Sequence, residues 1–592
     1  MKNLSRRDLL KGLAIGSVTV ASAGALASCA PQEKADAGKP GAAQGSGELV
    51  YAKRKSDVAG FSQTETDVLV IGGGGAGLCA ALSASEQGAQ VVLCEKTSVL
   101  GGATMLSSGK IPAVGTKQQE ELGEADSIGA CVMDIMRPSN YSVRPDLVYT
   151  VTEKSKDIVE WTEAHGAVWT IDAALYYGQT AHRIHTTDNA GKGLTDALIA
   201  SMDADPNITQ MLECEMMGLV LDDDGETVVG AYGKSGGDEL AIMAKNTVLA
   251  SSGFANNPDM LAQYCPEAVD AFKMVAPGAT GEGILWAQEL GAELQNMGAY
   301  QGHAFHGVDN GQTLEQGVAN NGGIIVNQEG NRFMSEYGGY SELSPHVLAQ
   351  TDHIAYLCFT DAQKEKSVKY PDWEEAGIVL TGATPAELAA AIGADAATLE
   401  KTIAEYQAAI EKGEDKFNRA HLPAGFDGPY YAVKITGEIR HTQGGMATDV
   451  AGHVLRADKS LIKGLYAAGG CTVGFSSSVS AFMNTPASSR RWFSARSPAR
   501  RRPPRTRKAR RWWNGRRATS TRTGRSCTPC RTDVPGLPVW QVRHFFVGGG
   551  WSVFARGGAD RASRALARPW VDQAATSVRP STDRASRALA RP

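Results

Sequence analysis

The chain has 592 residues, of which 42% are hydrophobic, and its formal net charge is −5. This length is enough for two or three globular domains with a large buried core, which excludes a fibre or a wholly disordered protein. The small net charge hides two different stretches, because residues 1–484 carry about −26 and residues 485–592 about +21. We therefore interpret the two stretches separately.

The N-terminus resembles a twin-arginine export signal. Residues 5–11 read SRRDLLK, and the stretch that follows, residues 12–27, is too short and too weakly apolar for a membrane helix. Residues 26–29 (LASC) resemble a lipobox, which predicts a lipidated Cys29 and membrane attachment; ordinary cleavage near Ala27 is the alternative. We predict a signal over 1–29, a flexible tether over 30–61, and a location on the periplasmic side of the cell envelope.

The ten cysteines suggest no metal site. None forms a CxxCH haem motif, and none has the clustered spacing of an iron–sulfur site. Only Cys527 and Cys530 have CxxC spacing. We therefore predict no metal and no electron relay within this chain.

A glycine-rich turn lies between a strand pattern at residues 66–71 and a helical pattern at 78–87. Its sequence, GGGGAG at 72–77, is typical of a dinucleotide site. Gly72 allows the tight turn, Gly74 lets the backbone approach a pyrophosphate, and Gly77 lets helix and strand pack closely. The amides at the helix N-terminus would face the phosphates. The predicted binding residues here are Gly72, Gly74, Gly75, Ala76 and Gly77.

A second predicted strand, residues 90–94, ends at Glu95, about 20 residues beyond the turn. A carboxylate at this position is expected to bind the adenosine ribose hydroxyls. Glycine-rich segments follow at 101–104 (GGAT) and 107–109 (SSG), and they favour FAD over NAD. Three further motifs come later in the chain: VLASSGFA at 248–255, GATGEG at 278–283 and GLYAAG at 464–469.

Together these motifs resemble the flavoprotein subunits of fumarate reductase and succinate dehydrogenase. The family includes soluble relatives such as flavocytochrome c-type reductases, urocanate reductases and 3-ketosteroid dehydrogenases. The resemblance spans roughly residues 64–484 and implies FAD as the cofactor. The further FAD contacts that it implies are Glu95, Lys96, Gly101, Gly102, Thr104, Ser108, Gly109, Ser252, Gly253, Thr280, Gly281, Gly283 and Gly469.

The resemblance also implies an α/β fold with a discontinuous, Rossmann-like FAD-binding domain. This domain would take residues 62–299 and 436–484, and residues 300–435 would form an inserted α+β capping domain. Within the cap, apolar spacing predicts helices at 385–392 and 395–412.

In this family a hydride passes from flavin N5 to one carbon of an activated double bond, and a protein acid protonates its neighbour. The segment QGH at 301–303 and the segment RHTQGG at 440–445 resemble the family's hinge motifs Q-x-H-P-T and H-H-T-x-G-G, so we predict that His303 and His441 act at the site. Residues 332–336 (RFMSE) match the motif R-F-x-N-E except that Ser335 replaces the asparagine. Four residues beyond it stands Tyr340, at the spacing where 3-ketosteroid dehydrogenases carry a catalytic tyrosine.

Several family residues are replaced. Tyr340 stands where fumarate reductases have their catalytic arginine, Ala319 and Gln316 replace its proton relay, and Ser480 replaces the arginine that clamps a carboxylate. A carboxylate taken from water needs a charge-assisted partner, so fumarate would be held poorly. Gly470 replaces a glutamate that contacts the ribityl chain.

These observations predict an exported FAD-dependent oxidoreductase that reduces an activated C=C bond of a small organic acceptor other than fumarate. The expected electron source is a separate cytochrome or membrane quinol oxidase module. One alternative is a 3-ketosteroid-type dehydrogenase. A second alternative is a flavin-bearing electron carrier with no organic substrate.

Residues 485–592 have a different composition, with 24 arginines, one lysine and no glutamate. Residues 560–569 recur verbatim at 583–592. A nucleic-acid-binding arm is one interpretation, but we predict no nucleic-acid partner. The family has a closing helix of small and aliphatic residues at this point, so we interpret the tail as the product of a shifted reading frame.

Overall fold

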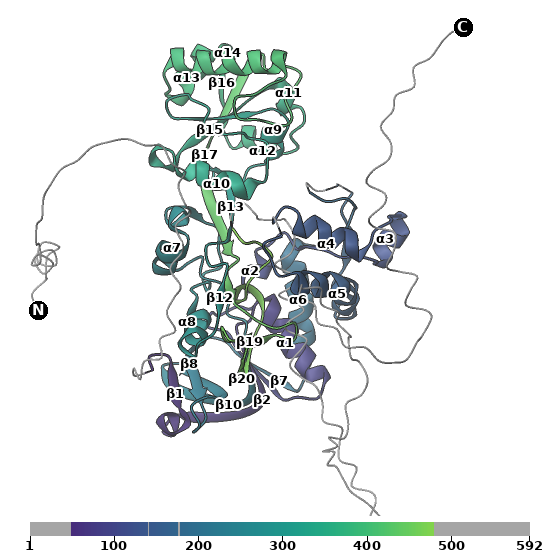
Figure 1. Cartoon of the computed structure of the whole chain (residues 1–592), viewed down its shortest axis with the longest axis vertical. Helices are drawn as coiled ribbons and strands as arrows, with labels where there is room; N and C mark the ends of the chain where they lie inside the picture. Colours follow the sequence, from purple (N-terminus) through teal and green to yellow (C-terminus); the bar gives the residue numbers. More distant parts are fainter. Residues whose placement is uncertain (1–48, 140, 174, 176–177, 479–592) are drawn as a thin grey trace, which may run out of the picture. The chain divides into compact units, whose positions relative to one another are not determined.

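A computed structural model of the protein describes residues 49–139, 141–173, 175 and 178–478 (Figure 1). The predicted signal with Cys29, residues 30–48 of the predicted tether, Ser480 and the arginine-rich tail with Cys527 and Cys530 lie outside these residues. Within the described part of the chain, no helix is long and apolar enough to cross a membrane.

Five parallel strands form the centre of the larger sheet. Their order is β7 (Ile208–Met211), β3 (Val91–Cys94), β2 (Ser62–Ile71), β10 (Asp238–Leu249) and β20 (Leu461–Ala467). The central strands end in continuous apolar runs, as strands buried on both faces do. The last strand, β20, comes from the far end of the described chain and pairs with β10.

Antiparallel strands extend this sheet beside the first half of β10. That half pairs with β9 (Val228–Ser235), β9 pairs with β8 (Cys214–Leu221), and β8 pairs in parallel with the edge strand β1 (Ala52–Arg54). Strand β19 (His453–Leu455) pairs with β20. Strand β2 begins four residues earlier than predicted, because its polar first half pairs with β10 without an apolar pattern.

Helices cover both faces of the larger sheet. Successive residues of β2 point to opposite sides, so the strand contributes to a core on each face. Val68 and Val70 pack in one core, whereas Leu69 and Ile71 pack in another. The first core is covered by α1 (Gly75–Glu86), α5 (Pro145–Ala164) and α6 (Ala190–Asp203), and the second by α7 (Pro258–Tyr264) and α8 (Glu282–Glu289) (Figure 1). Helix α1 begins earlier than residue 78, because Gly74 is its N-cap.

A small layer of helices and strands follows the second glycine-rich segment. It consists of α2 (Gly102–Met105), α3 (Lys117–Leu122), α4 (Ile128–Met136) and a sheet of β4 (Lys110–Pro112), β6 (Ile184–Thr187) and β5 (Trp169–Ile171).

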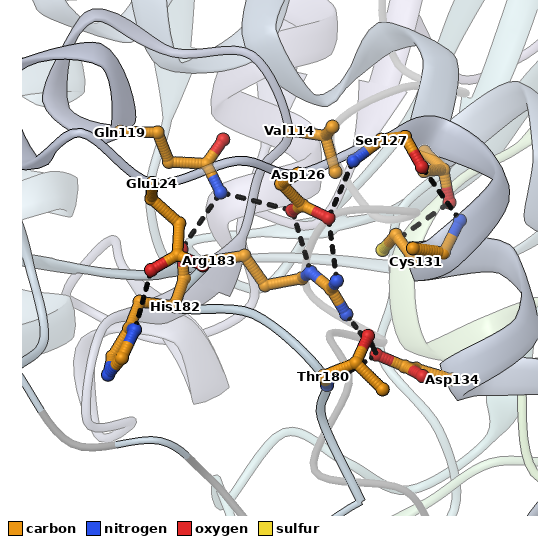
Figure 2. Close-up of polar contacts among 12 residues, drawn as sticks. Val114, Gln119, Glu124, Asp126, Ser127, Cys131, Asp134, Thr180, His182 and Arg183 are labelled. Carbon is orange, nitrogen blue, oxygen red and sulfur yellow. Dashed lines mark hydrogen bonds and ion pairs between the residues drawn. The ribbon is translucent and has the colours of Figure 1, made fainter.

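A buried arginine joins the parts of this layer. The side chain of Arg183 is 1% exposed, and its guanidinium donates to Asp126 (2.7 and 2.9 Å) and to Asp134 (2.5 Å) (Figure 2). Burial alone would raise the pKa of Asp126, but hydrogen bonds from Arg183 and Gln119 outweigh it and lower that pKa. The arginine therefore ties the start of β6 to helix α4 and to the loop before it.

The second sheet is built around the long strand β17 (Tyr430–Thr442). Its first half pairs with β15 (Ala355–Thr360) and β16 (Leu380–Gly382), and its second half pairs with β13 (Tyr300–Gly307) and β11 (Phe272–Lys273). At the edge of this sheet, β14 (Ile324–Asn327) pairs with β15. Its first three residues are apolar and buried.

The predicted helices in this part of the chain are present. Helix α13 (Pro385–Ile392) is capped by Thr384 and helix α14 (Ala396–Lys412) by Asp395. Both helices pack on one face of the second sheet (Figure 1). The other face is covered by α9 (Gly317–Asn320), α10 (Tyr340–Leu348) and α12 (Tyr370–Glu375).

The Arg183 cluster gives a stability prediction. Replacing Arg183 by Met would leave two buried carboxylates without a counter-charge, and we expect a loss of about 3–5 kcal/mol in the free energy of unfolding. Lys192→Met is the control, because its 2.6 Å pair with Asp196 is about half exposed and should contribute under about 1 kcal/mol. Denaturant unfolding measures both, and equal losses would contradict the account.

Candidate functional site

A cavity of about 330 Å³ opens at the carboxyl ends of the parallel strands. This edge is where open α/β sheets bind ligands. Two glycine-rich segments, the ends of β2, β3 and β10, and the segment before α8 form its walls. The predicted binding residues that line it are Gly72, Gly74, Gly75, Ala76, Glu95, Lys96, Gly102, Thr104 and Ser252.

The two glycine-rich segments contact each other through their backbones. The amide of Gly101 donates to the carbonyl of Gly73 (2.9 Å), and the amide of Gly75 donates to the hydroxyl of Thr104 (3.2 Å). A Cβ added at Gly102 would lie 3.2 Å from the Cα of Gly74. The segments therefore need glycine in order to approach this closely.

Glu95 is held at the mouth of the first glycine turn. Its carboxylate accepts from the amide of Gly73 (2.8 Å) and from the amide and hydroxyl of Thr97 (both 2.9 Å). These contacts fix the carboxylate on the cavity wall. A carboxylate has about four acceptor positions, so Glu95 can still accept from ligand hydroxyls.

Lys96 forms an ion pair beside the cavity. Its ammonium group donates to Thr280 (2.6 Å) and Glu282 (2.7 Å). Burial would raise the pKa of Glu282, but the hydrogen bonds from Lys96 and Thr280 lower it below its usual value. This pair joins the end of β3 to the start of α8.

A serine that the sequence did not single out contributes to the cavity wall. Ser251 lines its wall, and among the described residues its buried Oγ has no hydrogen-bond partner. A buried hydroxyl without a partner is costly. The glycine walls and Glu95 fit the pyrophosphate and the ribose of FAD.

The remaining predicted cofactor residues pack the backbone around the cavity. A Cβ at Gly77 would lie 1.8 Å from the carbonyl oxygen of Gly72, and added Cβ atoms at Gly109, Gly253, Gly281 and Gly283 would also meet atoms within 2.6 Å. Ser108 is exposed, and Gly469 has a positive φ of 80° where β20 ends. Apolar wall residues escaped the sequence analysis because they carry no motif: Cys94, Cys214, Met216 and Trp286.

Two of the three predicted catalytic residues, His303 and His441, are on the β13–β17 pair, and the third, Tyr340, packs against His303. Tyr340 is the first residue of α10, and its hydroxyl accepts from the side-chain amide of Gln301 (3.1 Å). Its ring stacks on His303, with centroids 4.5 Å apart. His441 stands opposite Gln301 in the strand register.

The two histidines differ in the ring nitrogen that donates. Burial lowers the pKa of His303 to about 3, so the ring is neutral at ordinary pH. Its Nδ1 accepts from the amide of Phe305 (3.2 Å), which leaves the proton on Nε2. The Nδ1 of His441 lies 3.2 Å from the carbonyl of Thr442, which can only accept. His441 therefore donates from Nδ1.

The RFMSE motif positions Tyr340. Arg332 makes two 2.8 Å hydrogen bonds to Glu336, which also accepts from Arg419 (2.9 Å) and from the amide of Ile325 (3.1 Å). Both side chains of the Arg332–Glu336 pair are at most 2% exposed. This network fixes the loop that leads from β14 to the N-terminus of α10.

Comparison with known proteins identifies the class. A family model described as "FAD binding domain" matches residues 67–481. A probable fumarate reductase, Ifc3, from Shewanella frigidimarina is 34% identical over 429 residues, which cover 71% of this chain and 72% of that protein. A urocanate reductase from Eggerthella lenta is 31% identical over 421 residues, which cover 69% of this chain and 70% of that protein.

Solved structures agree with this result. The open conformation of a flavocytochrome c3 fumarate reductase has a TM-score of 0.66 and 32% identity, with 75% of this chain and 78% of that chain covered. A 3-ketosteroid-Δ4-(5α)-dehydrogenase from Rhodococcus jostii RHA1 has a TM-score of 0.63 at 24% identity, with 76% and 99% covered, which is a likeness of fold alone.

The chain therefore belongs to the FAD-binding flavoprotein family of the fumarate reductases and their relatives. It is an FAD-dependent oxidoreductase of the class that acts on CH–CH and C=C bonds. The predicted cofactor and the predicted fold class, a Rossmann-like domain with a capping domain, are confirmed.

The cavity gives a prediction for Gly74. Its φ of −75° suits alanine, and an added Cβ would meet no protein atom nearer than 3.9 Å, so Gly74→Ala should keep the thermal midpoint of the apoprotein. The new methyl would occupy the space of the pyrophosphate, and the loss of charge-assisted hydrogen bonds should weaken FAD binding by at least about tenfold.

Two variants control this experiment, which measures FAD affinity by flavin fluorescence and stability by thermal unfolding. Gly77→Ala should destabilise the apoprotein itself, because its Cβ meets backbone. Gly60→Ala, which meets nothing within 4 Å, should change neither quantity. Wild-type FAD affinity in Gly74→Ala would contradict the assigned role.

Proposed function

We propose that this protein is an exported FAD-dependent reductase of an activated C=C bond in a small organic acceptor, and that fumarate is not its substrate. The observation that carries the proposal is the position of Tyr340, whose phenol lies against His303 and Gln301. A phenol at this point is a suitable proton donor to a carbon next to an activated double bond.

The proton relay of the fumarate reductases has no counterpart at the matching positions. Ala319 is buried and its carbonyl accepts from Arg419, while the side-chain amide of Gln316 donates to the carbonyl of Gly338. Neither side chain can carry a proton or balance a carboxylate. A dicarboxylate would therefore bind with uncompensated charge.

The site residues divide the chemistry among them. When bound, FAD supplies the hydride. Neutral His303 presents its Nε2–H and can polarise the carbonyl that activates the double bond. Gln301 donates to the oxygen of Tyr340 and so helps to orient the phenol. The carboxyl end of β17 brings His441 to the same face.

A 3-ketosteroid-type dehydrogenase is the second candidate, because Tyr340 has the spacing of the catalytic tyrosine in those enzymes. The likeness of fold is compatible with it. In that direction Tyr340 would accept the proton. This candidate predicts that a saturated 3-ketone bleaches the oxidised flavin without any added donor.

The electron supply and the location belong to the same proposal. We place the protein at the periplasmic side of the cell envelope, with electrons arriving from a separate cytochrome or a membrane quinol module. A relative in Shewanella frigidimarina is a fumarate reductase (cytochrome), 34% identical. We assign the cap to residues 300–435 and the FAD-binding domain to 62–299 and 436–484.

Anaerobic stopped-flow tests the reaction class. The reduced protein is mixed with fumarate, with a panel of other unsaturated acids and with enones, and flavin reoxidation is followed. We expect rapid reoxidation by an enone or an aryl-alkene and slow reoxidation by fumarate. Rapid reoxidation by fumarate would refute the proposal, and no reoxidation by any acceptor would favour an electron carrier.

Tyr340→Phe tests the proton donor. The variant keeps the ring that stacks on His303 but loses the hydroxyl, so kcat should fall roughly 100- to 10,000-fold while KM changes little. The control is Tyr431→Phe, which removes a hydroxyl bonded to Asp361 elsewhere in the second sheet. Steady-state reduction with an artificial donor measures both, and a fully active Tyr340→Phe variant would exclude this role.

A further inference from the structure

The guanidinium of Arg440 lies on the face that carries the catalytic side chains. Arg440 precedes His441 on β17, and regular alternation along a strand would put the two side chains on opposite faces. The register shows why they share one. Gln301 pairs with His441, but the next residue, Gly302, pairs with Ile439, so Arg440 is the extra residue of a β-bulge.

A second bulge lies close by on the partner strand. Three steps along β13, from His303 to His306, match only two steps along β17, from Glu438 to Thr436. This irregularity brings His306 to the face of Glu438, to which it is bonded at 2.9 Å. The two bulges therefore gather Arg440, His306 and Glu438 beside His303.

Arg440 is held by part of its guanidinium only. Its Nε donates to Glu438 (2.6 Å), and its Nη2 contacts both Glu438 and Thr313. No contact of Nη1 with the described residues is seen, and the side chain is 30% exposed. One edge of the group is thus rigidly oriented while Nη1 can donate to a ligand.

The charge of this arginine is largely cancelled. Glu438 is fully buried, and although burial raises its pKa, hydrogen bonds from His306 and the charge of Arg440 lower it below the usual range. The carboxylate is therefore ionised next to the guanidinium. The pair offers a directional donor with almost no net charge.

Such a donor favours a neutral acceptor over an anion. A ketone oxygen has two lone pairs and can accept from Arg440 and from His303 Nε2 together. A carboxylate would lose more hydration and would approach the buried charge of Glu438. The ring of Phe272 stacks on that of His306, with centroids 3.8 Å apart, and Phe272 is 44% exposed. It adds an apolar surface beside the Arg440–Glu438 pair.

We propose that Arg440 anchors the activating carbonyl of a neutral enone, and that Glu438 sets the preference for a ketone over a carboxylate by cancelling the charge of Arg440. This inference rests on the proposed function and specifies its substrate class. It makes Arg440 and Glu438 specificity-determining residues of the site.

The test uses two matched acceptors, 4-phenylbut-3-en-2-one and cinnamate, which share a phenyl-conjugated double bond and differ in a methyl ketone against a carboxylate. The kcat/KM of the full chain is measured for each with a reduced dye as donor. Wild type should prefer the ketone. Glu438→Gln removes the negative charge that cancels the charge of Arg440. It should shift the ratio of kcat/KM for the ketone to kcat/KM for the carboxylate toward cinnamate by roughly tenfold.

Arg440→Gln provides a second test. The Arg440 side chain is less buried than that of Glu438, so this variant still tests the inference if Glu438→Gln fails to fold. It should lower kcat/KM for the ketone by roughly 10- to 100-fold, and Arg440→Lys should restore little of it because the fixed fork is lost. Asp361→Asn, an exposed carboxylate bonded to Tyr431, is the matched control and should leave the ratio unchanged.

The outcomes separate the two proposals. If the wild type reduces the ketone but Arg440→Gln and Glu438→Gln both leave the ratio unchanged, this inference is wrong and the proposed function stands. A wild type that prefers cinnamate would also overturn the inference alone. If the wild type reduces neither acceptor nor any other alkene, both proposals fall together.

Discussion

The substrate side of this protein depends on the pairing of two strands, β13 and β17. The pair belongs to the second sheet, and at its end Thr442 accepts from the amide of Phe254 while the amide of Gln443 donates to Ala299. Every side chain that we assign to substrate chemistry is on this pair or packs against it, as the ring of Tyr340 packs against His303. The bulges in the pair decide which polar groups share a face, and in our proposal this selects the acceptor.

The cofactor side depends on a different constraint, the close approach of backbone to backbone. Gly72, Gly77 and Gly102 stand where any Cβ would meet main-chain atoms, whereas Gly74 borders open space. The first three allow the loops to close, and the fourth leaves room for a ligand. Glu95 and Lys96 add charged groups to walls that are otherwise largely apolar. The two sides meet where Thr442 lies against Gly253.

The sequence predicted the parts of the fold that follow from local rules. Glycine spacing predicted the turn before α1, and apolar periodicity predicted α13 and α14 to within a residue. It also named Tyr340, His303 and His441, which the structure brings together. The orientation of Arg440 could not be predicted, because a bulge depends on the register with a distant strand. Ser251 and the apolar wall residues carry no local signal, since only tertiary packing brings them to the cavity.

The central claim is that the site binds a neutral carbonyl between Arg440 and His303, with Tyr340 at the carbon to be protonated. A crystal structure of the FAD-loaded protein with 4-phenylbutan-2-one, the saturated ketone product, tests this claim most directly. We predict that the ketone oxygen lies within hydrogen-bond distance of Arg440 Nη1 and that the hydroxyl of Tyr340 faces the neighbouring carbon chain. A ketone bound with its oxygen away from both Arg440 and His303 would contradict the account.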